Sequence, residues 1–382
     1  MITKEKINET LEKFDKNKIT IATICSHSAL QIFFGAKQEG FRTLGICSSD
    51  TQKKSYQAFQ SSAPDEFLKV ESWKDILDEG FQEELIKKNA VIVPHGSFVE
   101  YVGTDNLLNN LKVPMFGNRQ SLEWESDRNK QREWLEKNAG LEMPKEYNRN
   151  EVQQGKLYFV KFGGAKGGKG FFKIRSAEQI DEEIEKMVKI KMLSKEDVKS
   201  ITIQDYIPGS RYYHHFFFSP LSNNGWEINY NSRPVGGVTL MGIDRRDETN
   251  IDDLHRTGLN PSEMREIGIM PSYSVAGNTP LIARESQLPK IFELADKSVK
   301  ASIKLFPPGM VGPFCIETFF TPEMKYIAFE VSCRIVAGTN LYPSGSPYTV
   351  YAFGDAAIST GRRIAQEVKT AVKTNQLEKV IY

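Results

Sequence analysis

The first third of the chain alternates short apolar runs with amphipathic segments. Residues 19–25 (ITIATIC) and 41–47 (FRTLGIC) have the continuous hydrophobicity of buried strands, and residues 26–40 between them have the pattern of a helix. Strands separated by helices favour a parallel sheet with helices on both faces. We therefore expect a doubly wound parallel α/β lobe over residues 1–125.

The pattern changes after a predicted helix at residues 119–139. Strand-like runs then dominate, with helices between and after them, which favours an α+β domain. The predicted strands are 156–162, 170–174, 201–207, 212–220, 226–234, 312–320 and 324–335, and the predicted helices are 177–190, 194–199, 285–304 and 351–373. We expect residues 126–382 to form this second domain, with a smaller subdomain at about residues 145–210.

The net charge of the chain bears on whether it binds anionic partners. The chain of 382 residues carries 50 Lys and Arg against 49 Asp and Glu, so its net charge is +1. This balance favours neither nucleic acid nor an anionic membrane as a partner, and no apolar run approaches the roughly 20 residues that span a bilayer. The N-terminal segment is polar, and the four cysteines lie in apolar runs without a CxxC pair. We expect a cytoplasmic protein with reduced cysteines and no zinc or iron–sulfur site.

A glycine-rich segment separates two predicted strands. Residues 161–170 (KFGGAKGGKG) hold five glycines and three lysines, which suits close approach of backbone N–H groups and ammonium groups to phosphate oxygens. The spacing resembles a Walker A loop, but no Ser or Thr follows the lysine and a strand follows instead of a helix. We interpret the segment as a flap that covers phosphates; the alternative is a surface hairpin without a ligand.

Two glutamates face each other in the predicted hairpin near the end of the chain. If its turn centres on residues 323 and 324, Glu317 lies opposite Glu330. Period-two alternation puts Ser332 and Arg334 on the face of Glu330. The expected core face is Phe314, Ile316, Ile327, Phe329 and Val331. Carboxylates and substrate phosphates are the usual ligands of Mg²⁺, and a nearby Arg stabilises charge on a transferred phosphoryl group. The alternative is a solvated surface cluster.

These features together resemble the ATP-grasp superfamily, and within it the archaeal formate-dependent 5-formaminoimidazole-4-carboxamide ribonucleotide synthetase family of purine biosynthesis. The resembling segments run from residue 19 to residue 340 and include VIVPHGSF, KFGGAKGGKGFF, GIDRRDETNID, PSYSVAGNTPLIARESQLP, GMVGPFCIE and FEVSCRIVAGTN. The resemblance implies an ATP-grasp fold and a ligase that phosphorylates formate with ATP. The amino group of aminoimidazole carboxamide ribonucleotide would then attack formyl phosphate, giving the formamido product, ADP and phosphate in the synthesis of IMP.

The resemblance also implies roles around ATP. Glu317 and Glu330 would hold Mg²⁺ or Mn²⁺, Arg334 would steady the transferred phosphoryl group, and Lys161 would reach the ATP phosphates. The implied nucleotide contacts are Gly163, Gly164, Gly167, Gly168, Gln204, Asp205, Tyr206, Ile207 and Glu248.

Three further residues would bind the ribonucleotide. His27 opens a helix after the first strand, where a helix N-terminus favours polar and anionic ligands. Ser97 follows another strand end, where open α/β sheets bind ligands. Asn278, in AGNTP, is similar to a family contact to the ribonucleotide.

The family tends to form homo-oligomers, and the aromatic run Tyr212–Phe218 is the expected contribution to an interface. Two other hypotheses remain open from the sequence. One is a relative that keeps the ATP machinery but joins a different acid and amine. The other is a nucleotide-binding protein without catalytic activity.

Overall fold

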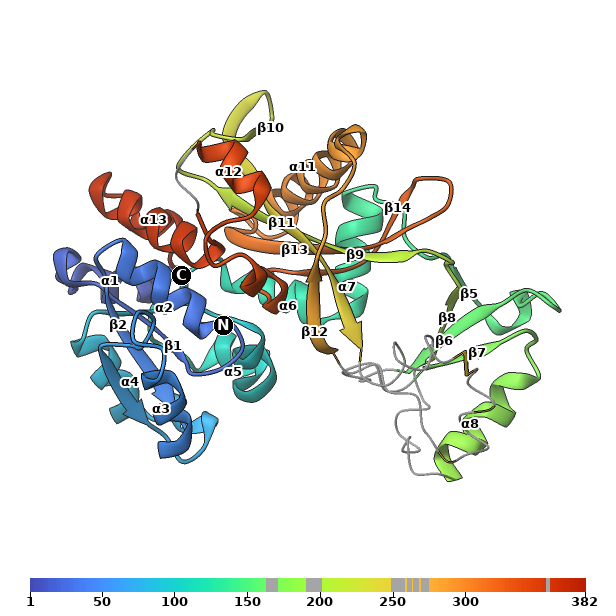
Figure 1. The fold of residues 1–382 in the computed structure, drawn as a ribbon, viewed down its shortest axis with the longest axis horizontal. Coiled ribbons are helices and arrows are strands. Elements are labelled where there is room, and N and C mark those ends of the chain that lie inside the picture. The colour runs from blue at the N-terminus through green and yellow to red at the C-terminus, as the bar shows by residue number, and fades with distance from the viewer. Residues whose placement is uncertain are drawn as a thin grey trace.

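Three sheets follow one another along the long axis of the molecule (Figure 1). The computed structural model describes residues 1–162, 171–189, 201–248, 275–354 and 358–382, together with residues 258, 259, 263 and 268. Part of the expected site lies outside this description, as does the helix expected at 194–199. The site residues concerned are Gly163, Gly164, Gly167 and Gly168.

The N-terminal lobe is the parallel sheet that the sequence predicts. Its strand order is β3-β2-β1-β4, and all five residues of β1 are buried, as the apolar run indicates. The strands are β1 Thr20–Ile24, β2 Arg42–Cys47, β3 Glu66–Lys69 and β4 Ala90–Ile92. The helices are α1 Lys4–Glu12, α2 Ala29–Gln38, α3 Asp50–Gln57, α4 Glu79–Lys87 and α5 Thr104–Asn109, and a π-helix, η3, covers Phe98–Gly103.

The central sheet has six strands in the order β10-β11-β9-β13-β14, with β12 paired to β11. The strands are β9 Ser210–Ser219, β10 Trp226–Tyr230, β11 Arg233–Glu248, β12 Val275–Pro280, β13 Gly312–Phe320 and β14 Tyr326–Ser332. The single strand predicted at 226–234 is wrong, because Asn231 and Ser232 take positive φ angles of 50° and 60° and turn the chain. The long strand β11 that follows was not predicted.

Helices cover one face of this sheet, and the N-terminal lobe and α13 lie at the other. The covering helices are α6 Arg119–Ser126, α7 Arg128–Arg132, η4 Glu133–Asn138 and α11 Leu288–Leu305. Trp134 anchors this core: its indole N–H donates to the Ser298 carbonyl at 2.9 Å. The helix predicted at 351–373 is instead two helices, α12 Pro347–Phe353 and α13 Thr360–Lys373. Gly354, at φ 71°, ends the first.

The aromatic run of β9 is buried inside the chain. β9 lies between β11 and β13; Phe216 and Phe218 belong to the core under α11, whereas Phe217 belongs to the core toward α13. The expectation that this run contributes to a subunit interface is therefore wrong. An inner strand of a sheet that is covered on both faces is continuously apolar because both of its faces are buried. A subunit interface is apolar for the same reason, so the sequence pattern does not distinguish the two.

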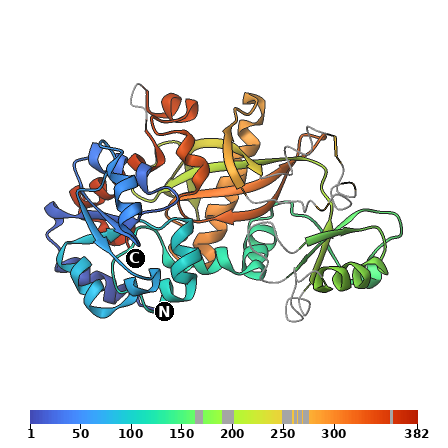
Figure 2. The same cartoon turned by 60° about the horizontal axis from the view of Figure 1, so that its bottom comes forward.

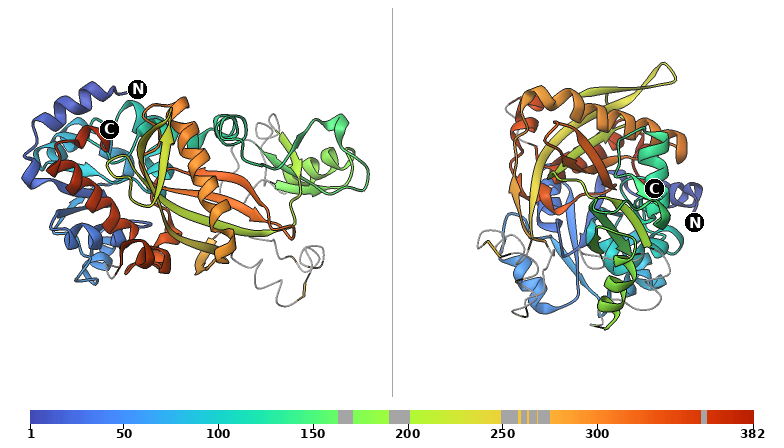
Figure 3. Two further views of the ribbon diagram at one scale, coloured as in Figure 1. Left: turned by 90° about the horizontal axis from the view of Figure 1, so that it is seen from above. Right: turned by 90° about the vertical axis from the view of Figure 1, so that its right-hand side faces the viewer.

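The third sheet is small and antiparallel, in the order β5-β8-β6-β7, with α8 packed on one face (Figure 2). Its elements are β5 Glu146–Tyr147, β6 Tyr158–Phe162, β7 Phe171–Ile174, β8 Ile201–Asp205 and α8 Gln179–Lys189. β6 and β7 pair directly, so the glycine-rich segment joins two antiparallel strands, as predicted. This sheet lies beyond the central one, at the end of the molecule away from the N-terminal lobe (Figure 3).

A close contact fixes the N-terminal lobe to the rest. α2 and α13 pack so tightly that a Cβ added to Gly361 would lie 2.2 Å from the Gln31 carbonyl oxygen. The Gln31 side chain accepts from the Gly361 N–H at 2.9 Å and donates to Thr339 and Asn340 at 3.2 and 3.0 Å. One buried amide thus links α2, α13 and the 3₁₀ helix η8, Ala337–Leu341.

Two further expectations concern the whole chain. All four cysteines are buried and unpaired, as predicted. Within the described ranges, no helix combines the length and hydrophobicity needed to cross a bilayer.

Candidate active site

The predicted pair of glutamates exists: Glu317 on β13 lies directly opposite Glu330 on β14. The register near the turn differs from the expectation, because Thr318 pairs with Ala328 and not with Phe329. Phe329 is the extra residue of a β-bulge, which restores the expected register at Glu330.

The bulge corrects the predicted core face of this hairpin. Phe329 turns to the side of Cys315 and stacks on Phe319 at 4.6 Å between ring centroids. Ala328 and Tyr326 take the core positions under α11 that were expected for Phe329 and Ile327. Phe314, Ile316 and Val331 are in that core as predicted.

Arg246 on β11 was missed by the sequence interpretation and lies at the centre of the site. Its guanidinium donates to Glu317 Oε1 at 2.7 Å and lies 3.8 Å from the centre of the Tyr213 ring. Burial lowers the pKa of Arg246, but Glu317 and, after it, Tyr213, Cys315 and Glu330 together outweigh burial and raise it. The alternation Asp244, Arg246, Glu248 along β11 was the available signal, since period two puts all three on one face.

Glu330 differs from Glu317 in its surroundings. Glu317 is buried and ion-paired, whereas Glu330 keeps solvent access, and no ion pair to it is found among the described residues. The Glu317 carboxylate, and after it the surrounding protein, raise the pKa of Glu330 to about 7. Two opposed carboxylates with unrelieved repulsion and an acidic, oxygen-only donor set fit a hard divalent cation.

Arg334, the predicted phosphoryl-stabilising residue, is held by Glu125 on α6. The Arg334 guanidinium lies 3.3 Å from Glu125 Oε1, and the other oxygen of Glu125 accepts from the Cys333 N–H at 2.7 Å. Burial raises the pKa of Glu125, and Arg334 opposes that effect. Glu125 is a second residue that the sequence interpretation missed, because its partners lie about two hundred positions away.

The N-terminal lobe brings His27 and Ser97 to the same place. His27 follows β1 with a positive φ of 52°, and its ring stacks on that of His95 with centroids 5.3 Å apart. Burial, then His95, Arg334 and Arg246, lower the pKa of His27. A Cβ on Gly96 would lie 2.8 Å from His27 Nε2 and 3.6 Å from Arg334 Cζ, so glycine is required at this approach.

Ser97 is linked to the residue before His27. Its hydroxyl donates to Ser26 Oγ at 2.9 Å, and its N–H donates to His95 Nδ1 at 3.2 Å. His95 is fully buried, with its other ring nitrogen 3.0 Å from the Ile24 carbonyl oxygen. Its ring therefore holds the segment around Ser97 against the end of β1.

Asn278 on β12 lies directly opposite Arg246 in the β11–β12 ladder. Its side-chain N–H donates to Asp244 Oδ2 at 2.6 Å, and the other Asp244 oxygen lies 2.6 Å from His215 Nε2. Asp244 accepts only, so this bond fixes the Asn278 amide with its NH₂ group toward Asp244. The Asn278 carbonyl oxygen is the atom left for a ligand.

Lys161 approaches the carboxylates from the small sheet. Burial and Arg128 lower the pKa of Lys161, and Glu330 and Glu146 oppose this change. Gln204 on β8 donates to Glu146 at 3.0 Å. The charges of Glu330 and Glu146 thus act on Lys161 from the central sheet and from the small sheet.

The other expected nucleotide contacts near Gln204 are Asp205, Tyr206 and Ile207, and they have different surroundings. Asp205 is ion-paired with Lys156 at 2.7 Å and accepts from the Tyr147 hydroxyl at 3.1 Å, whereas Tyr206 is 40% exposed. Ile207 follows in the connection to β9.

Glu248 is buried, and both of its carboxylate oxygens accept from Arg211 at 2.6 Å. The pair is bidentate, which is the strongest geometry available to these groups. Glu248 lies on the same face of β11 as Arg246, at the edge of the carboxylate site.

Comparison with known proteins places the chain among relatives that match its full length. Residues 179–382 match a family model described as a domain of unknown function (DUF1297), and residues 21–147 match a protein of unknown function (DUF1246). The chain is 51% identical over 381 residues to the 5-formaminoimidazole-4-carboxamide-1-(beta)-D-ribofuranosyl 5'-monophosphate synthetase of Methanosarcina acetivorans, covering 100% of both chains. It is 46% identical over 382 residues to the protein of the same name from Korarchaeum cryptofilum, again covering 100% of both.

The chain belongs to the 5-formaminoimidazole-4-carboxamide ribonucleotide synthetase family. Solved structures agree with this membership. The IMP biosynthesis protein PurP from Thermococcus kodakaraensis is 27% identical, with a TM-score of 0.69 over 95% of this chain and 100% of that one. N5-carboxyaminoimidazole ribonucleotide synthetase from Thermotoga maritima is 14% identical, with a TM-score of 0.56 over 92% and 76% of the two chains, which shows the shared fold alone.

Membership of this synthetase family settles two expectations. The fold is the predicted ATP-grasp fold, with the parallel N-terminal lobe before it. The chain is an ATP-grasp ligase of IMP biosynthesis, as the resemblance implied.

Proposed function

We propose that the chain joins formate to aminoimidazole carboxamide ribonucleotide at the expense of ATP, with formyl phosphate as the intermediate. A formate oxygen attacks the γ-phosphorus of ATP and ADP leaves. The ribonucleotide amine then attacks the formyl carbon, phosphate leaves, and the amine loses a proton. This route needs charge neutralisation, alignment and exclusion of water, and no covalent nucleophile of the protein.

The cationic groups of the site suit the phosphoryl-transfer step. Lys161 and Arg334 would contact the transferred phosphoryl group from two sides, and the segment 163–170 would cover the ATP phosphates. Gln204, Tyr206, Ile207 and Glu248 would meet the nucleoside part of ATP, with Asp205 holding its strand through Lys156.

Mg²⁺ or Mn²⁺ would be held by Glu317 and Glu330. The raised pKa of Glu330 beside Glu317 supports a cation between them, because a divalent ion would relieve that repulsion. When bound, the ion supplies a Lewis acid that neutralises charge on phosphate oxygens.

The ribonucleotide would bind where the N-terminal lobe meets the central sheet. His27 and Ser97 would contact its ribose phosphate side, and the Asn278 carbonyl oxygen would accept from an NH₂ group of its base. We propose residues 1–125 as the lobe that contributes His27 and Ser97, residues 126–382 as the catalytic domain, and about 145–210 as its flap subdomain.

One observation carries the proposal: Arg246 pairs with Glu317 and lies opposite Asn278 in the β11–β12 ladder. It therefore joins the phosphoryl-transfer residues to the ribonucleotide residues within one site. The test is to incubate the protein with ATP, Mg²⁺, formate and the carboxamide ribonucleotide, and to follow ADP and the formamido product. Equal amounts of the two products are expected; folded protein that binds ATP but gives neither refutes the reaction.

The acid is tested separately. With acetate or bicarbonate in place of formate, we expect ADP release to fall to the background rate. ADP release with another acid and none with formate would favour the relative that joins a different acid and amine. We further propose that the chain works in the cytoplasm as a homo-oligomer, which sedimentation velocity would test.

A further inference from the structure

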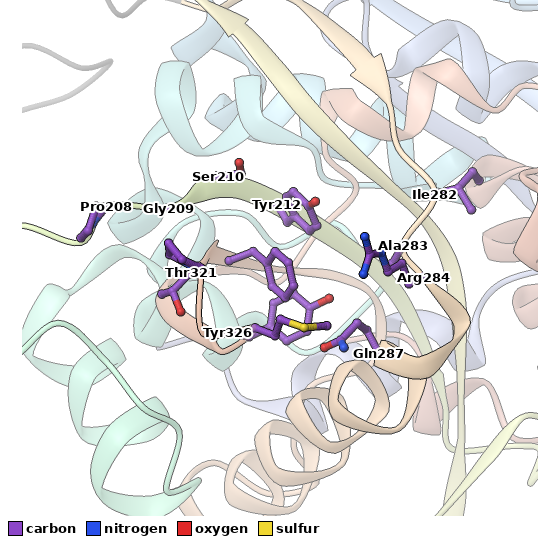
Figure 4. A pocket seen from close by; sticks show the side chains of 13 residues that line it. Pro208, Gly209, Ser210, Tyr212, Ile282, Ala283, Arg284, Gln287, Thr321 and Tyr326 are labelled. Atoms are coloured by element: carbon purple, nitrogen blue, oxygen red, sulfur yellow. The ribbon is translucent and has the colours of Figure 1, made fainter.

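A second cavity lies on the face of the central sheet away from the carboxylate pair. Along β9, Tyr213 faces Arg246, so its neighbour Tyr212 points to the opposite face. Tyr212 lines a cavity of about 720 Å³, a volume typical of small-molecule sites. The walls come from the start of β9, the β13–β14 turn and the segment before α11 (Figure 4).

Three buried polar atoms at this cavity have no hydrogen-bond partner in the described part of the chain. They are Thr321 Oγ1, Gln287 Oε1 and Tyr326 Oη, and the Gln287 and Tyr326 side chains are 5% and 7% exposed. Gln287 and Tyr326 line the cavity, and Figure 4 shows their side chains side by side, one from the short 3₁₀ helix before α11 (η7, Glu285–Gln287) and one from β14. An unpaired buried polar atom costs roughly 1–3 kcal/mol, so a ligand whose polar groups reach these atoms beside the cavity would relieve that cost.

Aromatic rings and one cation supply the other contacts. Tyr212, Phe320 and Tyr326 line the cavity, with Phe320 at 5.3 Å from Tyr212 and 4.9 Å from Tyr326 between centroids. Such rings bind planar groups through stacking and edge contacts. Arg284 is exposed at the rim, and no ion pair to it is found within the described ranges.

We propose that this cavity is a second ligand site for a small heteroaromatic molecule that carries an acidic group. Its ring packs on Tyr212 and Tyr326, its N–H donates to Gln287 Oε1, and its acidic group pairs with Arg284. A purine nucleoside monophosphate has this combination of groups and is the probe of choice. The site is separate from the proposed reaction and does not depend on it.

The position of the cavity couples it to the small sheet. Pro208 and Gly209, which line it, connect β8 to β9. A Cβ on Gly209 would lie 2.8 Å from the Phe320 carbonyl oxygen, so this connection is pressed against the β13–β14 turn. A ligand here touches both the turn and the connection, and thereby restrains the orientation of the small sheet.

The test is calorimetric titration of the full chain with AMP and with GMP. The protein is first saturated with a non-hydrolysable ATP analogue and the carboxamide ribonucleotide, so that the active site is blocked. We expect one additional molecule bound per chain, with a Kd below about 1 mM. Arg284→Ala should weaken it about tenfold, since a charge-assisted contact is lost, and Tyr326→Phe several-fold, since only a hydroxyl is removed.

Arg233→Ala, at an exposed arginine of β11 outside the cavity, is the matched control and should leave the Kd unchanged. Turnover without added mononucleotide should be that of the parent in all three variants. The proposal is overturned by absence of additional binding, by binding that disappears as the ATP analogue or ribonucleotide is raised, or by a Kd that neither cavity substitution changes.

Discussion

Three glutamates of the site have an arginine as ion-pair partner, whereas the described residues offer none to Glu330. Glu317 pairs with Arg246, Glu125 with Arg334 and Glu248 with Arg211. Glu330 has no ion pair among the described residues and faces Glu317 across the ladder. The arrangement leaves Glu330, within the described ranges, as the glutamate without an arginine partner at the point where the proposed cation and the ATP phosphates would meet.

Glu330→Gln is expected to separate stability from activity. Removing this carboxylate relieves repulsion with Glu317, so the thermal midpoint should not fall, while turnover should drop by roughly 100-fold or more. Product formation against Mg²⁺ concentration and a thermal melt of the same protein are the measurements. Glu323→Gln, in the exposed turn of the same hairpin, is the control; parent-like turnover in Glu330→Gln would contradict the metal assignment.

Asp244→Asn should weaken ribonucleotide binding and leave ATP binding unchanged. The introduced amide has one acceptor oxygen where Asp244 has two, so it can no longer accept from both Asn278 and His215, and the orientation of the Asn278 side chain is no longer fixed. We expect the KM for the ribonucleotide to rise about tenfold and the KM for ATP to stay constant. Asp247→Asn, which accepts from Thr279 on the same strand pair, is the matched control. An equal rise in both KM values would indicate a general structural defect.

The site residues differ in how far the sequence could predict them. Glu317 and Glu330 were predictable because a short turn and period two determine their pairing. Arg246 and Glu125 were not identified, because the partner of Arg246 is 71 positions away and a partner of Glu125 is 208 positions away. Contacts of that length depend on how the sheets assemble, which local pattern does not determine.

At the scale of elements, the close approach of the α2 and α13 backbones joins the N-terminal lobe to the rest of the molecule. Gly35 on α2 and Gly361 on α13 face each other, and a Cβ on Gly35 would lie 2.1 Å from the Arg362 nitrogen. The predicted helix at 26–40 is confirmed as α2, but nothing in its amphipathic pattern indicated a helix partner more than three hundred residues away. β11 escaped prediction because Gly236 and Gly237 interrupt its strand pattern.

Gly361→Ala tests this packing. The added methyl group would meet the Gln31 carbonyl oxygen, so the helices must separate, and we expect a loss of about 1–3 kcal/mol in the free energy of unfolding. Urea denaturation followed by circular dichroism is the measurement. Gly80→Ala on α4 is the control, because nothing lies within 4 Å of its added Cβ, and it should gain about 0.5–1 kcal/mol. Equal stability of the two variants would show that the contact is less tight than described.

At the scale of the whole molecule, buried neutral histidines link stability to pH. Burial lowers the pKa of His95 to about 4 and that of His214 to about 3. Both values lie below the roughly 6.5 of an unfolded chain, so the unfolded state binds protons first as pH falls. Protonation of these two histidines therefore leaves the free energy of unfolding unchanged above about pH 6.5 and lowers it progressively toward pH 4.

Acid titration should show this loss. Each histidine is expected to lower the free energy of unfolding by about 2 kcal/mol at pH 5 relative to pH 7, because its ring is protonated in the unfolded state and not in the folded state. Chemical denaturation at half-unit intervals between pH 4.5 and 7.5 gives the slope. His214→Asn should reduce that slope by about one proton. Glu330, with its pKa raised to about 7, acts in the opposite direction over this range, so the comparison between parent and His214→Asn is the test. Equal slopes would mean that the His214 ring is protonated in the folded state.

The amide of Gln31 has a mechanical consequence. By linking α2, η8 and α13, it makes the N-terminal lobe and the central sheet a single rigid frame. The small sheet is outside this frame and is joined to it at residues 139–145 and at Pro208 and Gly209, so we expect it to change its orientation when ATP binds. A donor and acceptor fluorophore on α4 and α11 should keep constant energy transfer through the catalytic cycle, whereas a pair on α8 and α11 should report each closure.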